Sequence, residues 1–104
     1  MNRHTRSLLI IALLMPLAAG AQPPAQRQGE LEQLLRQDCG SCHGMTLKGG
    51  LGPALTPEAL AGKPFELLVN SIIYGRPGTP MPPWKGLLTR EEAQWLVEQL
   101  QEGL

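Results

Sequence analysis

Residues 39–43 are Cys39-Gly40-Ser41-Cys42-His43, a C-x-x-C-H pentapeptide. This spacing is the attachment motif of a c-type haem. The two thiols can each form a thioether to one vinyl group of a single porphyrin. The histidine that follows is then held against the ring as an axial ligand of the iron. The motif therefore predicts covalent haem on Cys39 and Cys42, with His43 bound to the iron.

The C-x-x-C spacing has two other common interpretations. A thioredoxin-like dithiol needs a β-α-β context, and no alternating β-branched run occurs in this chain. A structural zinc site needs four ligands, whereas the sequence after residue 21 holds two cysteines and one histidine. Haem attachment is therefore favoured over both alternatives.

Residues 1–21 have the pattern of a secretory signal peptide. A basic start precedes an apolar run over residues 8–14, and small residues at 19–21 supply a cleavage site. The apolar stretch is too short for an ordinary membrane span. We expect cleavage before Gln22 and export to the bacterial periplasm, where haem is attached to such motifs. The alternative for this segment is an uncleaved membrane anchor. In an oxidising compartment, Cys39 and Cys42 could also form a reactive disulfide in place of the bonds to haem.

The sequence after residue 21 is long enough for one small domain. Cores of this size rarely supply more than about 3–5 kcal/mol of net stability, so a covalent haem would be the largest apolar group inside. Without residues 1–21 the nine basic residues become seven against nine acidic ones, a net charge of −2. This balance argues against nucleic acid or an anionic membrane as a partner.

Two segments precede or contain the motif. Residues 22–28 are polar and contain proline, which predicts a flexible leader. A helix is expected over residues 29–40, because Leu31, Leu34 and Leu35 fall on one face. This helix would deliver the cysteines to the haem edge, and residues 44–56 would follow as a glycine-rich loop.

The remainder of the chain contains helix signals separated by glycine and proline. Thr56 before Pro57 predicts a short helix, and an apolar stripe with helical spacing predicts another from Pro64 to a stop at Gly75. Residues 76–84 hold four prolines, which exclude regular structure. Thr89 with Glu92 forms a capping box for a last helix. Its expected buried stripe is Ala93, Leu96, Val97 and Leu100. The domain, residues 29–104, is therefore expected to be all-α.

The second axial ligand follows by elimination. The sequence after residue 21 has no histidine besides His43, and its only methionines are Met45 and Met81. Met45 is two residues from His43, a reach of about 7 Å, too short to pass around the ring. Met81, in the proline-rich loop, is therefore the expected distal ligand. A neutral thioether raises the potential, and six-coordinate iron has no vacancy for a substrate, which favours electron transfer over catalysis.

Several residues near the predicted site have more than one interpretation. A carbonyl of the Gly52-Pro53 turn is the expected acceptor for the other ring nitrogen of His43. Trp84 and Tyr74 are candidates for haem propionate contacts or ordinary packing, and Trp95 for packing on the first helix. The cations in or beside the loops would orient an acidic partner weakly or be solvated; they are Lys48, Lys63, Arg76 and Lys85.

The order of these motifs resembles that of class I c-type cytochromes from about Gly29 to Gly103. More closely, DCGSCHGM, KGGLGPALTPEAL and YGRPGTPMPPWKGLLTREEAQWLVEQL are similar to small periplasmic monohaem cytochromes encoded beside haem-c/haem-d1 nitrite reductase in denitrifying bacteria. The first helix departs from many class I members because it lacks an aromatic residue. The crossing of the terminal helices is therefore expected to use leucines against Trp95.

The resemblance implies covalent haem c on Cys39 and Cys42, with His43 and Met81 axial. It implies a monomeric, non-enzymatic electron carrier that donates to nitrite reductase and receives electrons from a quinol-derived or cytochrome donor. A maturation factor acting late in d1-haem biosynthesis is the alternative. A third possibility, a five-coordinate haem enzyme or gas sensor, requires Met81 to be off the iron.

Overall fold

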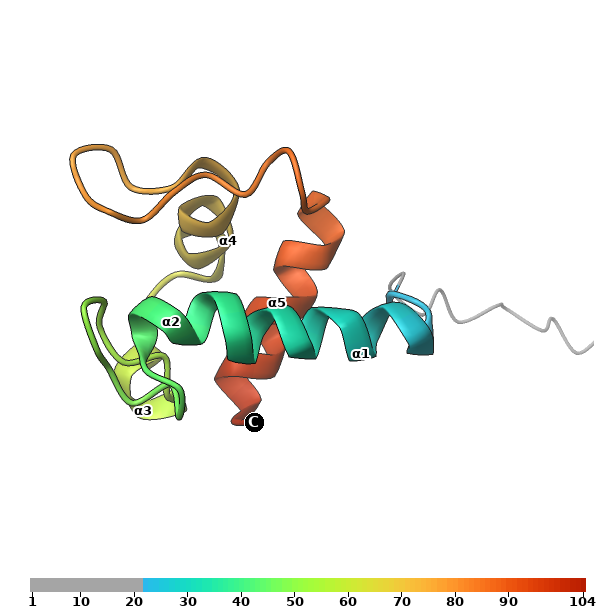
Figure 1. The fold of residues 1–104 in the computed structure, drawn as a ribbon, viewed down its shortest axis with the longest axis horizontal. Coiled ribbons are helices and arrows are strands. Elements are labelled where there is room, and N and C mark those ends of the chain that lie inside the picture. Colours follow the sequence, from blue (N-terminus) through green and yellow to red (C-terminus); the bar gives the residue numbers. More distant parts are fainter. Residues whose placement is uncertain (1–21) are drawn as a thin grey trace, which may run out of the picture.

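The computed structural model describes residues 22–104, which are helical and contain no strand, as expected for an all-α domain (Figure 1). The helices are α1 (Ala25–Leu34), α2 (Gly40–His43), α3 (Pro57–Leu60), α4 (Phe65–Tyr74) and α5 (Arg90–Glu102), with a π-helical turn, Leu35–Cys39, between α1 and α2. The predicted signal peptide, residues 1–21, lies outside the described residues. Within residues 22–104, every helix is too short or too polar to cross a bilayer.

The first helix begins earlier than the sequence predicts. It starts at Ala25 and not near Gly29, so residues 25–28 of the expected flexible leader are helical. No side chain caps this end. Instead the Arg27 guanidinium donates to both carboxylate oxygens of Glu92 at the start of α5, at 2.9 and 3.1 Å. This contact between residues 65 apart along the chain joins the first turn of α1 to α5.

A π-helical turn joins α1 to α2 and gives one continuous helix that ends at His43 (Figure 1). Leu31, Leu35 and Cys39 are spaced four residues apart, and the wide turn keeps all three on the side that faces the core. Leu31 and Leu35 are buried and Cys39 packs against the same cluster. Such turns often occur at functional sites, and this one ends at the first cysteine of the motif.

Helix α5 is the centre of the core. One group of its side chains, including Trp95 and Leu96, packs with Leu31 and Leu35 of the first helix. A second group, Ala93 and Val97, packs against Val69 and Ile73 of α4. The predicted stripe of α5 is therefore buried, and the terminal helices meet through leucines and Trp95 as expected.

The capping signals in the sequence mark the observed helix starts. The Thr56 hydroxyl accepts from the Ala59 N–H at 3.3 Å at the start of α3. At the start of α5, the Thr89 hydroxyl accepts from the Glu92 N–H at 3.1 Å. The Glu92 carboxylate in turn accepts from the Thr89 N–H at 3.2 Å, which completes the capping box.

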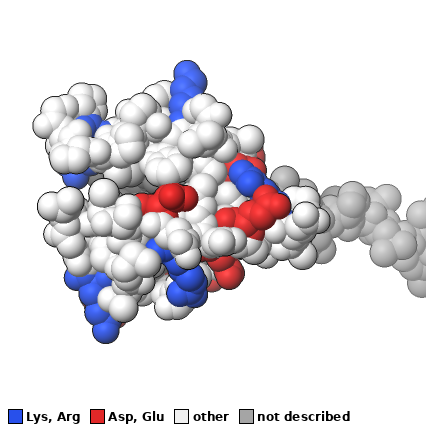
Figure 2. Space-filling view, in the orientation of Figure 1, with Lys and Arg blue, Asp and Glu red and all other residues white. Residues whose placement is uncertain are grey.

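Charge is unevenly distributed over residues 22–104. All nine acidic residues lie within the helical segments, whereas four basic residues lie in the loops. In the face shown in Figure 2, acidic side chains gather over the centre and right, and several basic ones lie over the loop end on the left. The loop cations are those named above: Lys48, Lys63, Arg76 and Lys85.

Candidate haem site

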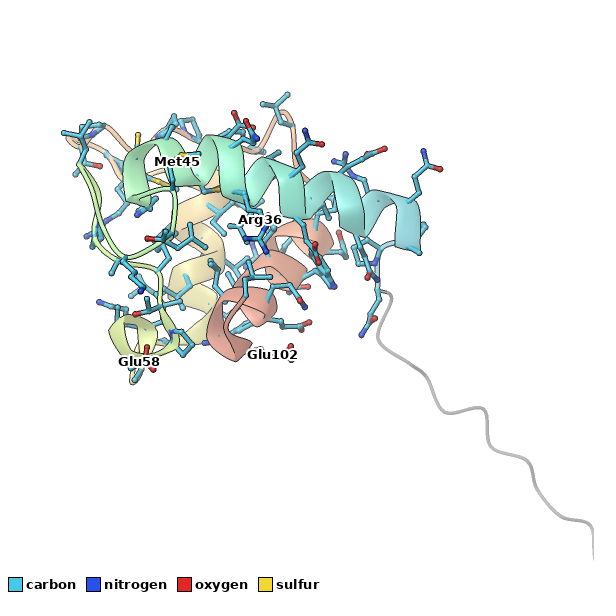
Figure 3. All side chains as sticks on the ribbon, turned by 60° about the horizontal axis from the view of Figure 1, so that its bottom comes forward. Arg36, Met45, Glu58 and Glu102 are labelled. Carbon is cyan, nitrogen blue, oxygen red and sulfur yellow. The ribbon has the colours of Figure 1, made fainter. Side chains whose placement is uncertain are left out.

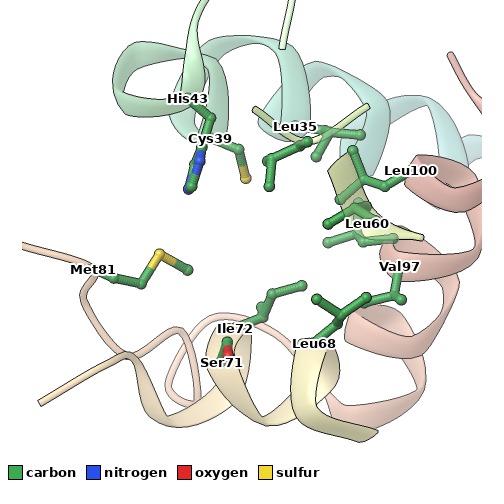
Figure 4. A pocket seen from close by; sticks show the side chains of 12 residues that line it. Leu35, Cys39, His43, Leu60, Leu68, Ser71, Ile72, Met81, Val97 and Leu100 are labelled. Atoms are coloured by element: carbon green, nitrogen blue, oxygen red, sulfur yellow. The ribbon is translucent and has the colours of Figure 1, made fainter. Parts of the chain in front are cut away.

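An apolar pocket opens between the first helix, α4 and α5 (Figure 4). Its wall is built mainly from aliphatic side chains, among them Leu35, Leu68 and Leu96. A second cavity of about 310 Å³ at its mouth shares Cys39, His43 and Met81 with it. Cofactor pockets typically measure about 300–1,000 Å³, so the space and its apolar wall suit a large flat cofactor.

His43 enters this pocket from the end of α2. Its Nδ1 lies 2.7 Å from the carbonyl oxygen of Pro53. A carbonyl can only accept, so Nδ1 carries the proton and Nε2 keeps its lone pair for a metal. The hydrogen bond fixes the ring orientation and increases its basicity. The expected acceptor in the Gly52-Pro53 turn is thus confirmed.

The glycine-rich loop reaches His43 because it folds back onto the motif. Gly49 N–H donates to the His43 carbonyl and Gly52 N–H to the Cys42 carbonyl, each at 2.8 Å. These bonds satisfy carbonyls that the end of α2 leaves without helical partners. A Cβ at Gly52 would lie 2.8 Å from Nδ1 and Cε1 of the His43 ring. Only glycine lets the turn approach the imidazole this closely.

Met81 faces His43 across the pocket (Figure 4). It comes from the proline-rich loop between α4 and α5, while His43 comes from the end of the first helix. The imidazole nitrogen and the thioether sulfur therefore meet the same space from opposite sides. This is the arrangement that two axial ligands of one flat macrocycle require.

Both cysteines line the mouth of the pocket, and Cys39 also lines its apolar interior. Burial raises the pKa of the Cys39 thiol to about 11, with the nearby Asp38 carboxylate adding to the effect. Such a thiol stays protonated at neutral pH and is a poor site for a free thiolate. A neutral thioether, in contrast, is compatible with this apolar wall.

The structure also places the other residues that the sequence singled out. Met45, which the sequence analysis rejected as the distal ligand, is 66% exposed on the surface beside α2 (Figure 3). Trp84 lines the mouth and packs against the core. Tyr74 is exposed, and the Lys85 ammonium lies 5.7 Å from its ring centroid. Among residues 22–104, no three His, Cys, Asp or Glu side chains converge as a metal-ion site.

The sequence analysis missed the residues that hold the Met81 loop. Arg76 N–H donates to the Met81 carbonyl at 3.1 Å, and Thr79 bonds to the backbone of both Arg76 and Met81. Gly75 packs directly on the backbone of residues 81–83. The only sequence signal was the glycine that ends α4, which was interpreted solely as a helix stop.

The apolar pocket and the C-x-x-C-H motif beside it suit a haem attached through two cysteines. The family model described as cytochrome c oxidase, cbb3-type, subunit III matches residues 26–99. The chain belongs to the c-type cytochromes, electron carriers with covalently bound haem c. Its single C-x-x-C-H motif corresponds to one haem.

Within this family the chain is similar to cytochrome c55X. It is 60% identical to that of Pseudomonas aeruginosa over 91% of this chain and 80% of the relative. It is 54% identical to that of Stutzerimonas stutzeri over 97% and 93%. The solved structure of the c-type cytochrome NirC has a TM-score of 0.76 and 65% identity, covering 77% of this chain and 94% of NirC.

A larger relative contains a similar segment. Dihydro-heme d1 dehydrogenase of Pseudomonas aeruginosa is 38% identical over 90% of this chain and 19% of its own length. A solved structure of dihydro-heme d1 dehydrogenase NirN in complex with DHE has a TM-score of 0.65, covering 70% of this chain and 16% of that protein. The same small fold thus forms part of a longer protein.

Proposed function

We propose that this chain is a periplasmic electron carrier that donates electrons to nitrite reductase in denitrification. Cys39 and Cys42 would hold the haem covalently, and His43 and Met81 would be the protein ligands of its iron. The observation that carries the ligand assignment is the opposition of His43 and Met81 across one apolar pocket (Figure 4). When bound, haem c supplies a one-electron ferric/ferrous couple.

The protein would supply the ligands of the iron, an apolar wall around the haem and an open edge for a partner. His43, polarised by the Pro53 carbonyl, would be a strong donor to the iron. Met81 and the aliphatic wall favour the ferrous state, because a neutral thioether and a dry pocket stabilise the lower charge. The mouth, lined by Cys42, Pro80 and Trp84, leaves one edge of the site open to a partner. With both ligands supplied by the protein, the iron would have no free position at which to bind a substrate.

The choice of nitrite reductase as acceptor rests on the similarity to NirC and on the resemblance to cytochromes encoded beside that enzyme. We further propose that residues 1–21 are a signal peptide removed before Gln22 and that the remaining chain acts as a monomer. A quinol-derived or cytochrome donor would reduce it. The loop cations would bias its approach toward an acidic surface of the acceptor.

Stopped-flow mixing of reduced holoprotein with oxidised nitrite reductase tests this proposal. We expect fast, saturable reoxidation that slows as ionic strength rises, because salt screens the steering charges. The Lys85→Gln variant removes one loop cation and leaves the proposed ligands in place. It should still transfer electrons, with a weaker salt dependence. Negligible transfer from intact holoprotein would reject nitrite reductase as the acceptor.

A second candidate function is oxidation or reduction of a d1-haem precursor during assembly of nitrite reductase. The observation that favours it is the 38% identity to dihydro-heme d1 dehydrogenase and to its structure with DHE. Both functions use the same haem site and differ in the partner. Mixing the ferric protein with that dehydrogenase and its substrate distinguishes them, since this candidate predicts reduction of the cytochrome in step with turnover.

A further inference from the structure

Gly75 has a position that no other residue type fits. It ends α4 with φ of 67° and is buried. A Cβ at this position would lie 2.6 Å from the Met81 carbonyl oxygen and 2.8 Å from the backbone of Pro82 and Pro83. The end of α4 therefore rests directly on the backbone that carries the thioether of Met81.

Hydrogen bonds close the Met81 loop at the same place. Arg76 N–H donates to the Met81 carbonyl at 3.1 Å. The Thr79 hydroxyl donates to the Arg76 carbonyl at 2.6 Å and accepts from the Met81 N–H at 3.3 Å. Both backbone polar groups of Met81 are thereby tied to Arg76 and Thr79, which lie within four residues of Gly75.

The later part of the loop is anchored to α4 as well. Trp84 N–H donates to the Ile72 carbonyl at 3.0 Å, and Lys85 N–H donates to the Ile73 carbonyl at 3.1 Å. These bonds use carbonyls of the last turn of α4 that have no helical partner. The loop thus has little freedom to retreat from α4 without breaking several bonds at once.

We propose that Gly75 and Thr79 are positioning residues that set the distance of Met81 from the site opposite His43. Gly75 does so by close contact and Thr79 by its bridge across the loop. The inference rests on the proposed axial role of Met81. Ordinary contact begins near 3.4 Å, so alanine at position 75 would displace the Met81 backbone by about 0.8 Å. Metal–ligand distances hold within about 0.2 Å, so a backbone shift of this size is large enough to draw the sulfur out of bonding distance.

The test compares Gly75→Ala with Gly78→Ala in the holoprotein. Gly78 lies in the same loop with φ of 78°, but a Cβ there meets nothing within 4 Å. Both positions have a positive φ, and only Gly75→Ala also creates a clash. We expect Gly75→Ala to lose the weak far-red band of ferric methionine–iron bonding and to bind carbon monoxide rapidly when ferrous. Gly78→Ala should keep the band and bind carbon monoxide as slowly as the unaltered protein.

A second pair of variants tests the same inference even if Gly75→Ala fails to fold. Thr79→Val removes the hydroxyl bridge at nearly constant volume, whereas Thr79→Ser retains it. We expect the far-red band to weaken in Thr79→Val and to persist in Thr79→Ser. Far-ultraviolet circular dichroism and haem content, measured on all four variants, show whether the helices and covalent attachment are retained.

The outcomes separate this inference from the proposed function. Absence of the far-red band in the unaltered protein would refute the ligation by Met81 itself. If that band is present, its persistence in Gly75→Ala or equal loss in both glycine variants would overturn the role of the Gly75 contact. An unchanged band in Thr79→Val would overturn the role of the bridge.

Discussion

The Gly52→Ala substitution tests how the imidazole of His43 is held. The new Cβ would lie 2.8 Å from Nδ1 and Cε1, about 0.6 Å inside ordinary contact at 3.4 Å. The ring and the turn must therefore separate. The hydrogen bond from Nδ1 to the Pro53 carbonyl, now 2.7 Å, would lengthen to about 3.3 Å, beyond the usual limit of about 3.2 Å.

This change should raise the midpoint potential. The hydrogen bond makes His43 a stronger donor, which favours ferric iron, so its loss favours ferrous iron. A hydrogen bond contributes about 0.5–1.5 kcal/mol, and 1.4 kcal/mol corresponds to ~59 mV for one electron. We expect a positive shift of about 20–60 mV. Overpacking should also cost about 1–3 kcal/mol of stability.

Spectroelectrochemical titration of the holoprotein measures the shift. Gly86→Ala is the matched control, because its Cβ would meet nothing within 4 Å. The far-red methionine–iron band must be followed in parallel, so that loss of Met81 is not mistaken for a change at His43. A midpoint that stays constant or falls in Gly52→Ala, with that band intact, would refute the reasoning. An equal rise in Gly86→Ala would refute it as well.

Three other predictions concern stability. The Glu92 pKa is held below its usual value by its hydrogen bonds from Arg27. The stability that Glu92 contributes is therefore present above the unfolded pKa of about 4.3 and is lost as pH falls. In urea titrations Glu92→Gln should be less stable than the unaltered protein near neutral pH, with the difference vanishing in acid, while Glu91→Gln should show little difference at either pH. Leu96→Ala should lower the unfolding free energy by about 2–5 kcal/mol because Leu96 is 1% exposed. The 70% exposed Leu87, changed to alanine, should shift it by less than about 0.5 kcal/mol. A variant with both cysteines replaced by alanine should show strongly reduced helical circular dichroism, because nothing would fill the central pocket; a native-like spectrum would contradict this.

Local signals in the sequence predicted most of the helices. Thr56 and Thr89 cap α3 and α5 because each hydroxyl accepts a bond from an N–H three residues later. Gly75 and Gly103 end α4 and α5 with positive φ. These devices act over one helical turn, so the residues that form them are adjacent in the sequence and can be recognised there.

The start of α1 could not be predicted in this way. Its first turn has neither apolar periodicity nor a side-chain cap. The Arg27–Glu92 ion pair, formed across the chain, connects it to α5. The π-helical turn is likewise a property of the backbone, although its result, the alignment of Leu35 and Cys39 on one side, serves the site directly.

The residues of the site also fall into a group that the sequence predicts and a group that it does not. The groups that would bind the cofactor are side chains of rare types, so counting cysteine, histidine and methionine was enough to predict them. The groups that orient them are backbone atoms: the Pro53 carbonyl beside His43 and the Gly75 backbone beside Met81. Backbone atoms leave no signature of their own in the sequence except where a side chain would collide with them. A glycine that lies next to a ligand is therefore the mark of an orienting contact, and Gly52 and Gly75 supply one on each side of the pocket. If both contacts act as argued, Gly52→Ala changes the potential while the methionine–iron band is kept, whereas Gly75→Ala removes the band itself.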